Sequence, residues 1–332
     1  MFRFIITMSV FCFVLVGNAP VSFAKPVPVL VERQGLYYPV NSQKPYTGSQ
    51  KNFYYDKQLK SSSSLKRGKF EGPFLTYHSN GQLKQKSNYK NGLMTGLYEE
   101  YYSNGQLSKK TATIDAVFNG PFKSYYKNGQ IKVSQFFNKG ILEGKFTEYF
   151  KNGDLKHQLS YSAGKPAGEE RLYNGSGKLK MKTNWKNGKQ DGVRLEYFDG
   201  LLREKTTYVG GDEEGPFSRF WSNTKLLRDK GTYGKNGLEG FYEKYFEPKF
   251  TKGAHILERK GHYKNGKETG VHVEYDTSGN KTQICSYKQG KKHGQCEEWK
   301  NGELSFVRKY LNGKYQETTY ANPKLRSNYN RR

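Results

Sequence analysis

The sequence predicts an all-β fold, namely an elongated single-layer antiparallel sheet built from tandem β-hairpin repeats of 24 residues. A glycine recurs every 24 residues along most of the chain, and a fixed period in the twenties is typical of repeat arrays. Asn-Gly pairs, which favour tight β-turns, recur within the period. No helical periodicity follows the N-terminus, so no helix is expected to cover the sheet. The glycines that define eleven units are Gly48, Gly72, Gly96, Gly120, Gly144, Gly168, Gly192, Gly215, Gly240, Gly270 and Gly294.

The unit from Gly72 to Thr95 shows the pattern most clearly. Counting its glycine as position 1, aromatic residues occupy positions 3, 6 and 18, and an aliphatic residue occupies position 12. Asn80-Gly81 and Asn91-Gly92 mark two turns, so each unit is predicted to be two short strands. If both turns are two-residue loops, positions 3, 7, 12 and 18 share one face and positions 6 and 13 share the other. Eleven such units would form a ribbon roughly 100 Å long.

Residues 1–24 are predicted to be a signal peptide. Arg3 supplies the positive start, residues 4–17 form the apolar segment, and Ala24 ends a small-x-small cleavage motif. The alternative is a membrane anchor, although this apolar run is shorter than a spanning helix requires. Cleavage after Ala24 predicts a periplasmic or secreted protein.

The rest of the chain divides at the limits of the array. Residues 25–47 are predicted to be an extended lead-in and N-terminal cap, residues 48–313 the repeat array, and residues 314–332 a basic C-terminal tail. An insertion at about residues 247–262 lengthens one hairpin. Insertions in repeat arrays form loops that often carry function.

The chain is strongly basic, with 56 Lys and Arg against 30 Asp and Glu and a net charge of +26. Such charge favours an anionic partner such as nucleic acid, lipid, acidic polysaccharide or an acidic protein. Tyr at position 6 and Lys at position 13 would alternate along one face as a ladder of rings and cations. In the alternative interpretation, each Lys stem only covers its Tyr neighbour while the ammonium stays in water. The candidate binding residues are Tyr77, Lys84, Tyr125, Lys132, Tyr149, Lys156, Tyr173 and Lys180.

Two cysteines follow the predicted signal peptide, Cys285 and Cys296, on the same face of the hairpin that turns at Gln289-Gly290. They lie diagonally across a two-residue loop, or directly opposite if the loop has four residues. An exported protein retains disulfides, so a bridge is plausible, and two half-buried thiols are the alternative. No metal site is expected, because these cysteines and His293 provide too few ligands.

No catalytic motif is present in the sequence. It contains no phosphate-binding glycine-rich loop, no His-Glu-x-x-His and no serine elbow, so neither enzymatic activity nor a cofactor is expected. A cluster of His255, His262 and Glu258 in the insertion is the one remaining alternative, against ordinary loop residues.

The unit G-x-[YF]-x-x-Y-[YF]-x-N-G-[QK]-L-K, followed by Y-K-N-G-x-x-x-G, resembles the bacterial variant of the MORN repeat found in antitoxin proteins of the YwqK type. The residues that carry the resemblance are Phe74, Tyr77, Asn80, Gly81, Leu83, Tyr89, Asn91, Gly92 and Gly96. It implies a β-hairpin array that binds a partner and does no chemistry, the partner being a toxin in the antitoxin family. A cytoplasmic antitoxin has no use for a signal peptide. An antitoxin role for this chain therefore requires a toxin that acts outside the cytoplasm.

These features predict an exported, non-catalytic repeat protein that binds or scaffolds an anionic or acidic macromolecule. The alternative is an antitoxin or immunity protein for an exported toxin. The expected partner is a protein, or an anionic lipid, polysaccharide or nucleic acid, and no small-molecule substrate is expected. The sequence leaves the oligomeric state open.

Overall fold

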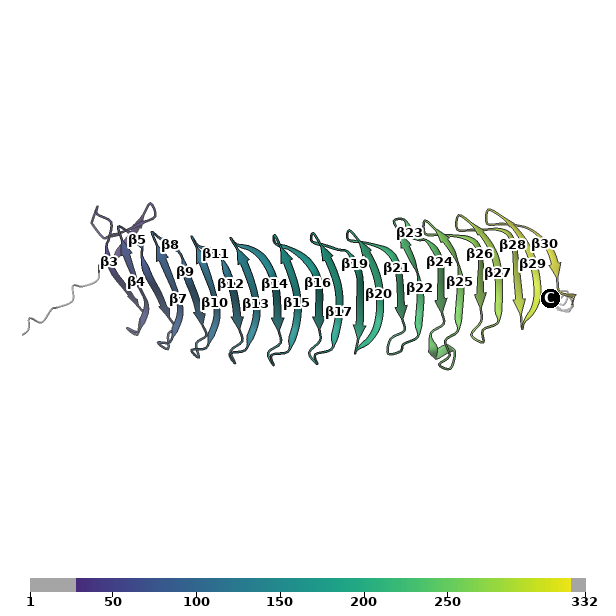
Figure 1. Cartoon of the computed structure of the whole chain (residues 1–332), viewed down its shortest axis with the longest axis horizontal. Coiled ribbons are helices and arrows are strands. Elements are labelled where there is room, and N and C mark those ends of the chain that lie inside the picture. Colours follow the sequence, from purple (N-terminus) through teal and green to yellow (C-terminus); the bar gives the residue numbers. More distant parts are fainter. Residues whose placement is uncertain (1–27, 324–332) are drawn as a thin grey trace, which may run out of the picture.

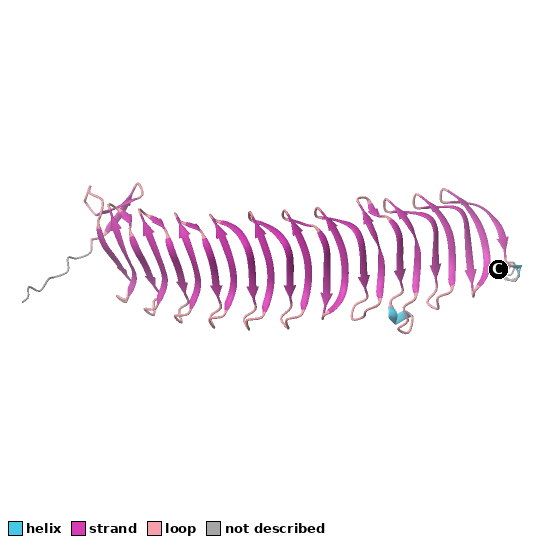
Figure 2. Cartoon of the chain, in the orientation of Figure 1, coloured by secondary structure: helices cyan, strands magenta, loops and turns pink. Residues whose placement is uncertain are grey.

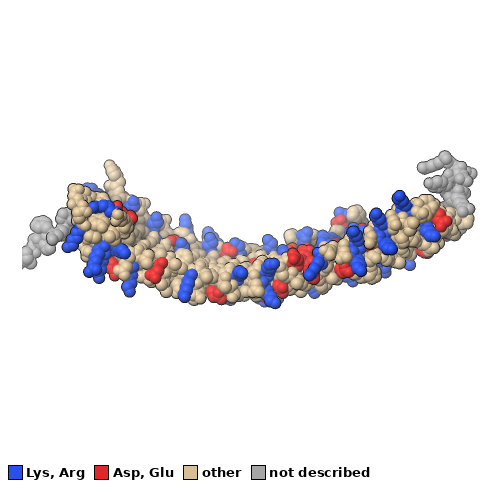
Figure 3. Space-filling view, turned by 90° about the horizontal axis from the view of Figure 1, so that it is seen from above, with Lys and Arg blue, Asp and Glu red and all other residues tan. Residues whose placement is uncertain are grey.

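The computed structural model describes residues 28–323, so the predicted signal peptide and residues 324–332 of the predicted tail lie outside the described residues. Strands β3 to β30, 28 in number, form one long antiparallel sheet in which the strands pair in chain order (Figures 1 and 2). The predicted fold class is therefore confirmed. The sheet is gently curved along its length (Figure 3). None of the described helices is long and apolar enough to span a membrane.

Each of the eleven units contributes a first and a second long strand. The first strands are β3 (Gly48–Phe53), β6 (Gly72–Tyr77), β9 (Gly96–Tyr101), β12 (Gly120–Tyr125), β14 (Ile141–Tyr149), β16 (Lys165–Tyr173), β19 (Gly192–Phe198), β21 (Asp212–Phe220), β24 (Gly240–Tyr245), β26 (Lys267–Tyr275) and β28 (Lys291–Lys300). The second strands are β4 (Leu59–Lys66), β7 (Leu83–Lys90), β10 (Leu107–Ile114), β13 (Ile131–Asn138), β15 (Leu155–Ser162), β17 (Leu179–Lys186), β20 (Leu201–Val209), β22 (Leu227–Gly234), β25 (Leu257–Lys264), β27 (Lys281–Lys288) and β29 (Glu303–Leu311).

Short strands complete the second turn of five units, and β30 ends the sheet. These are β5 (Lys69–Phe70), β8 (Leu93–Met94), β11 (Val117–Phe118), β18 (Lys189–Gln190), β23 (Gly237–Leu238) and β30 (Lys314–Ala321). Before the array, β1 (Leu30–Arg33) and β2 (Leu36–Pro39) form a separate hairpin. The 3₁₀ helix η1 (Pro248–Phe250) lies in the insertion.

The second turn of each unit follows the sequence prediction. At Asn91-Gly92 both central residues have positive φ, 51° and 84°, as a type I′ turn requires. All turns of this kind lie along one long edge of the sheet, the upper edge in Figure 1, which we call the second-turn edge.

The first turn differs from the prediction. The His78 N–H donates to Gln82 O, the Gly81 N–H donates to His78 O, and Gly81 but not Asn80 has positive φ. The Asn80 amide instead accepts a hydrogen bond from the Gln82 N–H and donates to Ser103 O in the next unit. These contacts define a three-residue loop that ends in a left-handed glycine. The first turns line the other long edge, which we call the first-turn edge.

A β-bulge follows this longer loop and changes the faces that the sequence predicted. Tyr77 pairs with Leu83 while Thr76 pairs with Gln85, so Lys84 is an extra residue on its strand. Position 13 therefore joins positions 3, 5, 7, 16 and 18 on one face, which we call the aromatic face, while positions 4, 6 and 12 lie on the opposite face. The predicted placement of positions 12 and 13 is thus wrong, because it assumed a two-residue first turn.

Contacts in other units agree with this assignment. The Lys156 ammonium at position 13 lies 2.7 Å from Glu148 at position 5. The Tyr101 hydroxyl at position 6 donates to Glu99 at position 4, at 3.1 Å. Positions 4 and 5 are adjacent on one strand, so their side chains point to opposite faces.

The aromatic face provides the main packing of the sheet. Phe70, Phe74 and Tyr89 lie with ring centroids 5.2–5.5 Å apart, and Phe217 and Tyr242 are almost fully buried. Position 16 lies opposite the position-3 ring and is small in many units. Its buried small side chains include Ser63, Ser87, Thr111 and Thr183. Small residues there leave room for the neighbouring rings.

Hydrogen bonds tie each unit to the next along both edges. On the first-turn edge the Tyr126 hydroxyl donates to Tyr149 O at 2.8 Å. On the second-turn edge the Gly140 N–H donates to Phe118 O at 2.8 Å, and the Ala163 N–H donates to the Glu143 carboxylate at 2.7 Å. The repeated Asn, Gly, Tyr and acidic residues thus have structural roles, as nearest-neighbour stability in a repeat array requires.

The β1–β2 hairpin packs on the first units of the array. The Tyr37 ring lies 5.2 Å from Phe70, and the Tyr37 N–H donates to Gly68 O. The rings of Tyr37, Phe70 and Phe74, together with Leu65, border a pocket of about 450 Å³ under the hairpin.

Candidate binding surfaces

The structure does not assemble the predicted Tyr and Lys ladder in the form expected. Because of the bulge, the position-6 residues Tyr77, Tyr125, Tyr149 and Tyr173 and the position-13 residues Lys84, Lys132, Lys156 and Lys180 lie on opposite faces. Position 13 instead approaches the ring at position 7. The Lys132 ammonium lies 5.9 Å from the Tyr126 centroid, and Lys156 lies 6.0 Å from Phe150.

The position-7 rings are therefore the residues that sequence reasoning missed. Where the ring is a tyrosine, its hydroxyl bonds the next unit, as Tyr102 does to Tyr125 O, so these tyrosines stabilise the fold. Lys156 is also engaged, since its hydrogen bond with Glu148 raises the pKa of the Lys156 ammonium. The signal that would have found the position-7 rings is the length of the first loop. A three-residue loop followed by a bulge places position 13 on the same face as position 7.

A different row of cations lies along the second-turn edge. Strand register places two lysines directly opposite each other in four of its turns. These pairs, which we call the lysine pairs, are Lys66 with Lys69, Lys186 with Lys189, Lys264 with Lys267, and Lys288 with Lys291. All eight of these side chains are exposed, and in residues 28–323 no carboxylate lies within ion-pair distance of any of them. Figure 3, seen from above Figure 1, shows Lys and Arg projecting along the length of the molecule.

The stems of these lysines are held in line by the repeat. Methylene carbons of Lys69, Lys189 and Lys291 lie close to the turn glycine of the following unit, at Gly92, Gly211 and Gly313. Packing of the stem leaves the ammonium in water. Neighbouring turns are two strands apart, so the pairs at Lys264 and Lys288, which lie in consecutive units, are about 10 Å apart. The pairs at Lys66 and Lys186 lie in the first and sixth units.

An apolar stretch precedes the C-terminal lysine pairs on the same edge. Leu93, Val117 and Ile141 occupy the equivalent turn position in three consecutive units and are each about half exposed. Val117 and Ile141 approach the turn glycine of the next unit, at Gly140 and Gly164. The edge thus carries an apolar segment as well as a basic one.

A polar network interrupts the aromatic face in the middle of the array. Glu170 takes the position of an aromatic residue, and its carboxylate is hydrogen-bonded to His157 at 2.7 Å and to the Trp185 indole at 2.8 Å. Burial by itself raises the pKa of Glu170, but the hydrogen bonds from His157 and Trp185 outweigh it and hold the pKa below the usual value. Glu170 is therefore a satisfied buried acid.

The insertion does not assemble the cluster of histidines and glutamate that the sequence left open. His255 stacks on Tyr245 at 4.1 Å, Glu258 pairs with Lys244 at 2.6 Å, and His262 packs against Phe241 at 5.2 Å. The three side chains thus have separate partners. Within residues 28–323 no group of three His, Cys, Asp or Glu residues is arranged to hold a metal ion.

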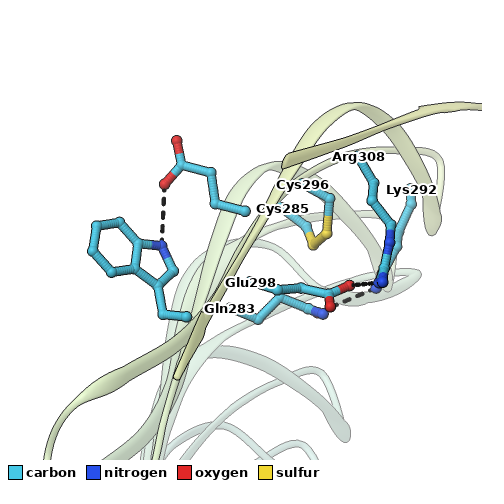
Figure 4. Close-up of a disulfide and its surroundings, with 8 residues drawn as sticks. Gln283, Cys285, Lys292, Cys296, Glu298 and Arg308 are labelled. Atoms are coloured by element: carbon cyan, nitrogen blue, oxygen red, sulfur yellow. Dashed lines mark hydrogen bonds and ion pairs between the residues drawn. A yellow bond between two sulfur atoms is a disulfide. The ribbon is translucent and has the colours of Figure 1, made fainter. Parts of the chain in front are cut away.

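Cys285 and Cys296 are joined by a disulfide across β27 and β28 (Figure 4). They are directly opposite in register although the turn at Gln289-Gly290 has two residues. The first strand of the unit carries two extra residues between Lys292 and Cys296, and this irregularity brings a diagonal pair into register. Both cysteines are fully buried, beside the Glu298–Arg308 ion pair.

The sheet is single, its strands pair in chain order, and hydrogen bonds join each unit to the next along both edges. These features define the class of protein as a tandem β-hairpin repeat protein. Five of its repeats match the MORN repeat variant family, over residues 70–91, 94–112, 118–139, 142–163 and 167–187.

A comparison with curated proteins finds no match. Among solved structures, the Tc holotoxin pore of Photorhabdus luminescens is 12% identical with a TM-score of 0.19, and the match covers 87% of this chain and 17% of that one. A porin-like protein from Bacteroides uniformis is 11% identical with a TM-score of 0.14, over 81% of this chain and 91% of that one.

Proposed function

We propose that this β-hairpin repeat protein is an exported, non-catalytic scaffold that binds a linear polyanion along its second-turn edge. The observation that carries the proposal is the set of four lysine pairs in direct cross-strand register. Export is proposed from the predicted signal peptide alone.

The lysine pairs are unfavourable in the isolated protein. Like charges directly opposite on two strands destabilise a hairpin, by an amount comparable to the 0.2–1 kcal/mol that an opposite-charge pair contributes. Ion pairs on the two faces show that the chain provides carboxylates elsewhere, for example Glu99 opposite Lys110. Lysines left without acids along one edge are consistent with an anionic partner that supplies the missing charge.

The spacing fits a long partner rather than a small one. The four pairs extend over nine repeats of the edge, roughly 85 Å, and the last two pairs are about 10 Å apart. A polymer that lies along the edge would contact several pairs at once and release counterions at each. Once one lysine pair has bound the polymer, binding at the next pair is intramolecular, so several weak contacts give a higher overall affinity.

Salt-dependent binding to a fluorescent single-stranded oligonucleotide, used purely as a charge probe, tests the proposal. The edge variant Lys264→Gln/Lys267→Gln/Lys288→Gln/Lys291→Gln removes four charges. If all four contact phosphates, the slope of log affinity against log salt falls by about 3. Between 50 and 200 mM salt, four such contacts correspond to about a fifty-fold loss of affinity in the unmodified protein.

The matched control removes four lysines from the aromatic face, Lys84→Gln/Lys132→Gln/Lys156→Gln/Lys180→Gln. Equal loss in both variants would mean that only net charge matters, and loss confined to the control would place binding on the predicted ladder. Either result contradicts an edge site.

An antitoxin or immunity protein of the YwqK type is the second candidate, and the apolar stretch of Leu93, Val117 and Ile141 favours it. Exposed aliphatic residues in a row are typical of a protein interface. A pull-down from cell-envelope and secreted extract tests it with the variant Leu93→Ser/Val117→Ser/Ile141→Ser. A single protein that survives a high-salt wash and is lost in this variant supports the immunity role. Retention by the variant contradicts it.

A further inference from the structure

A pocket of about 390 Å³ lies on the first-turn edge, opposite the edge that carries the lysine pairs, and three consecutive loops build it. Arg203 comes from the start of β20, Trp221 follows the end of β21, and Arg228 comes from the start of β22. The insertion closes the pocket with Glu247 and Lys249 at η1.

The insertion that forms this wall is held in one conformation. The Phe250 N–H donates to Glu247 O at 2.9 Å, and the Gly253 N–H donates to Pro248 O at 2.8 Å. The Thr251 side chain is buried and bonds the backbone of its own loop. His255 then fixes the loop to the sheet by stacking on Tyr245 and bonding Leu227 O at 3.2 Å. The pocket is therefore pre-formed.

Positive charge dominates the lining. Arg203, Arg228 and Lys249 carry three positive charges, and Glu247 contributes one carboxylate, 2.7 Å from Lys249. Arg228 lies 3.7 Å from Asp229, but that acid is bonded mainly to Arg219 at 2.7 Å. In residues 28–323 no carboxylate lies within ion-pair distance of Arg203. At least one guanidinium is thus free to bind an anion.

The indole of Trp221 adds a hydrogen-bond donor. Its Nε1 is buried and has no acceptor among the described residues. An unpaired buried N–H costs free energy, and an oxygen atom from a ligand in the pocket that Trp221 lines would satisfy it. A second donor type, the Ser222 hydroxyl, also borders the pocket.

We propose that this pocket binds a phosphate group, either as free phosphate or as the terminal phosphomonoester of a larger molecule. A planar guanidinium donates two parallel hydrogen bonds to a phosphate, and a phosphate offers further oxygens for the ammonium and the indole. The site does not depend on the polyanion proposal, because it lies on the other long edge and uses none of the lysine pairs.

Indole NMR resonances give a direct test, since the chain has three tryptophans, Trp185, Trp221 and Trp299. Each indole ¹⁵N–¹H signal is assigned with a Trp→Phe variant. Inorganic phosphate is then titrated against chloride at equal ionic strength, and methyl phosphate is titrated in a second arm. We expect a saturable shift of the Trp221 signal, with the other two unchanged.

The variant Arg203→Met/Arg228→Met should weaken phosphate binding by at least about tenfold, because a hydrogen bond to a charged group contributes about a factor of ten or more. The matched control is Lys123→Met/Lys145→Met, which removes two exposed lysines and should leave the Trp221 shift unchanged. The unaltered Trp185 and Trp299 signals show that each variant is folded.

Binding of methyl phosphate as well as phosphate would assign the site to a terminal phosphate on a larger molecule, and binding of phosphate alone would assign it to the free ion. A shift that chloride reproduces, that does not saturate, or that persists in the Arg203→Met/Arg228→Met variant would overturn the proposal.

Discussion

Gly261 provides a sharp test of how the aromatic face is packed. It lies in β25 directly opposite Tyr242, the place that position 16 takes in units without the insertion. A Cβ at this glycine would overlap the ring of His272 in the next unit. That ring is held on three sides, by Tyr263 at 5.3 Å, by Tyr287 at 4.9 Å and by a hydrogen bond from His272 Nε2 to His262 O at 2.8 Å.

We expect Gly261→Ala to destabilise the array by about 2 kcal/mol. Overpacking a filled site costs about 1–3 kcal/mol, and losing the His272 hydrogen bond adds about 1 kcal/mol. Alanine also lowers the entropy of the unfolded chain, which stabilises the folded protein by about 0.4–1 kcal/mol. This gain applies because Gly261 has no positive φ that alanine would strain. The sign of the effect therefore depends entirely on the His272 ring.

Denaturant unfolding combined with hydrogen exchange would measure this loss. Because contacts in such an array are between neighbours, faster exchange should be confined to the strands around β25 to β27. Gly231→Ala is the graded control, since a Cβ there would meet Tyr242 and Phe217 at 3.1 and 3.2 Å without overlap. It should cost less than Gly261→Ala.

The double variant Gly261→Ala/His272→Ala isolates the cause. If the clash is with the ring, adding Gly261→Ala to His272→Ala should cost nothing further. A single Gly261→Ala variant that is as stable as the parent protein would refute the packing described for this unit.

Three further predictions concern the turns, the buried acid and the disulfide. Asn91→Gly should be tolerated, because Asn91 has a φ of 51°, whereas Asn80→Gly should cost about 1 kcal/mol in denaturant unfolding by losing its side-chain bond to the next unit. The lowered pKa of Glu170 contributes stability that is present above its ordinary value of 4.5 and is lost as pH falls below it, so Glu170→Gln should flatten the acid side of a pH–stability profile. A slope equal to that of the parent would contradict this. Reducing the disulfide at Cys285 should cost about 2–3 kcal/mol, with faster hydrogen exchange confined to β27 and β28.

The sequence predicted the architecture well because the repeat period and the second turn are local signals. At Asn91-Gly92 the residue types themselves favour positive φ, and the structure has it. Asn80-Gly81 has the same residue types but forms a three-residue loop, because Asn80 bonds to the neighbouring unit. A contact between units cannot be inferred from one unit alone.

That single difference explains why the candidate ladder changed. A loop one residue longer, followed by a bulge at Lys84, moves every position-13 lysine to the other face. The lysine pairs, in contrast, could have been found from the sequence, since Lys-x-Gly-Lys around a two-residue turn places both lysines opposite each other. The structure was needed to show that these lysines have no described carboxylate within ion-pair distance.

Positions 7 and 13 also indicate where this array has a role beyond stabilising its own fold. In the fifth unit Lys156, at position 13, is paired with Glu148 at 2.7 Å. In the fourth unit the hydroxyl of Tyr126, at position 7, bonds the next unit. In the eighth unit those positions are Arg228 and Trp221, whose indole N–H has no described acceptor, and the following unit carries the insertion that covers them. Two substitutions and one insertion in the repeat pattern thus converge on one pocket, although the fold is complete without them in the other units. On the aromatic face and the first-turn edge, the regular positions stabilise the array and the irregular ones are left to bind a ligand. The phosphate titration of Trp221 tests that reasoning directly.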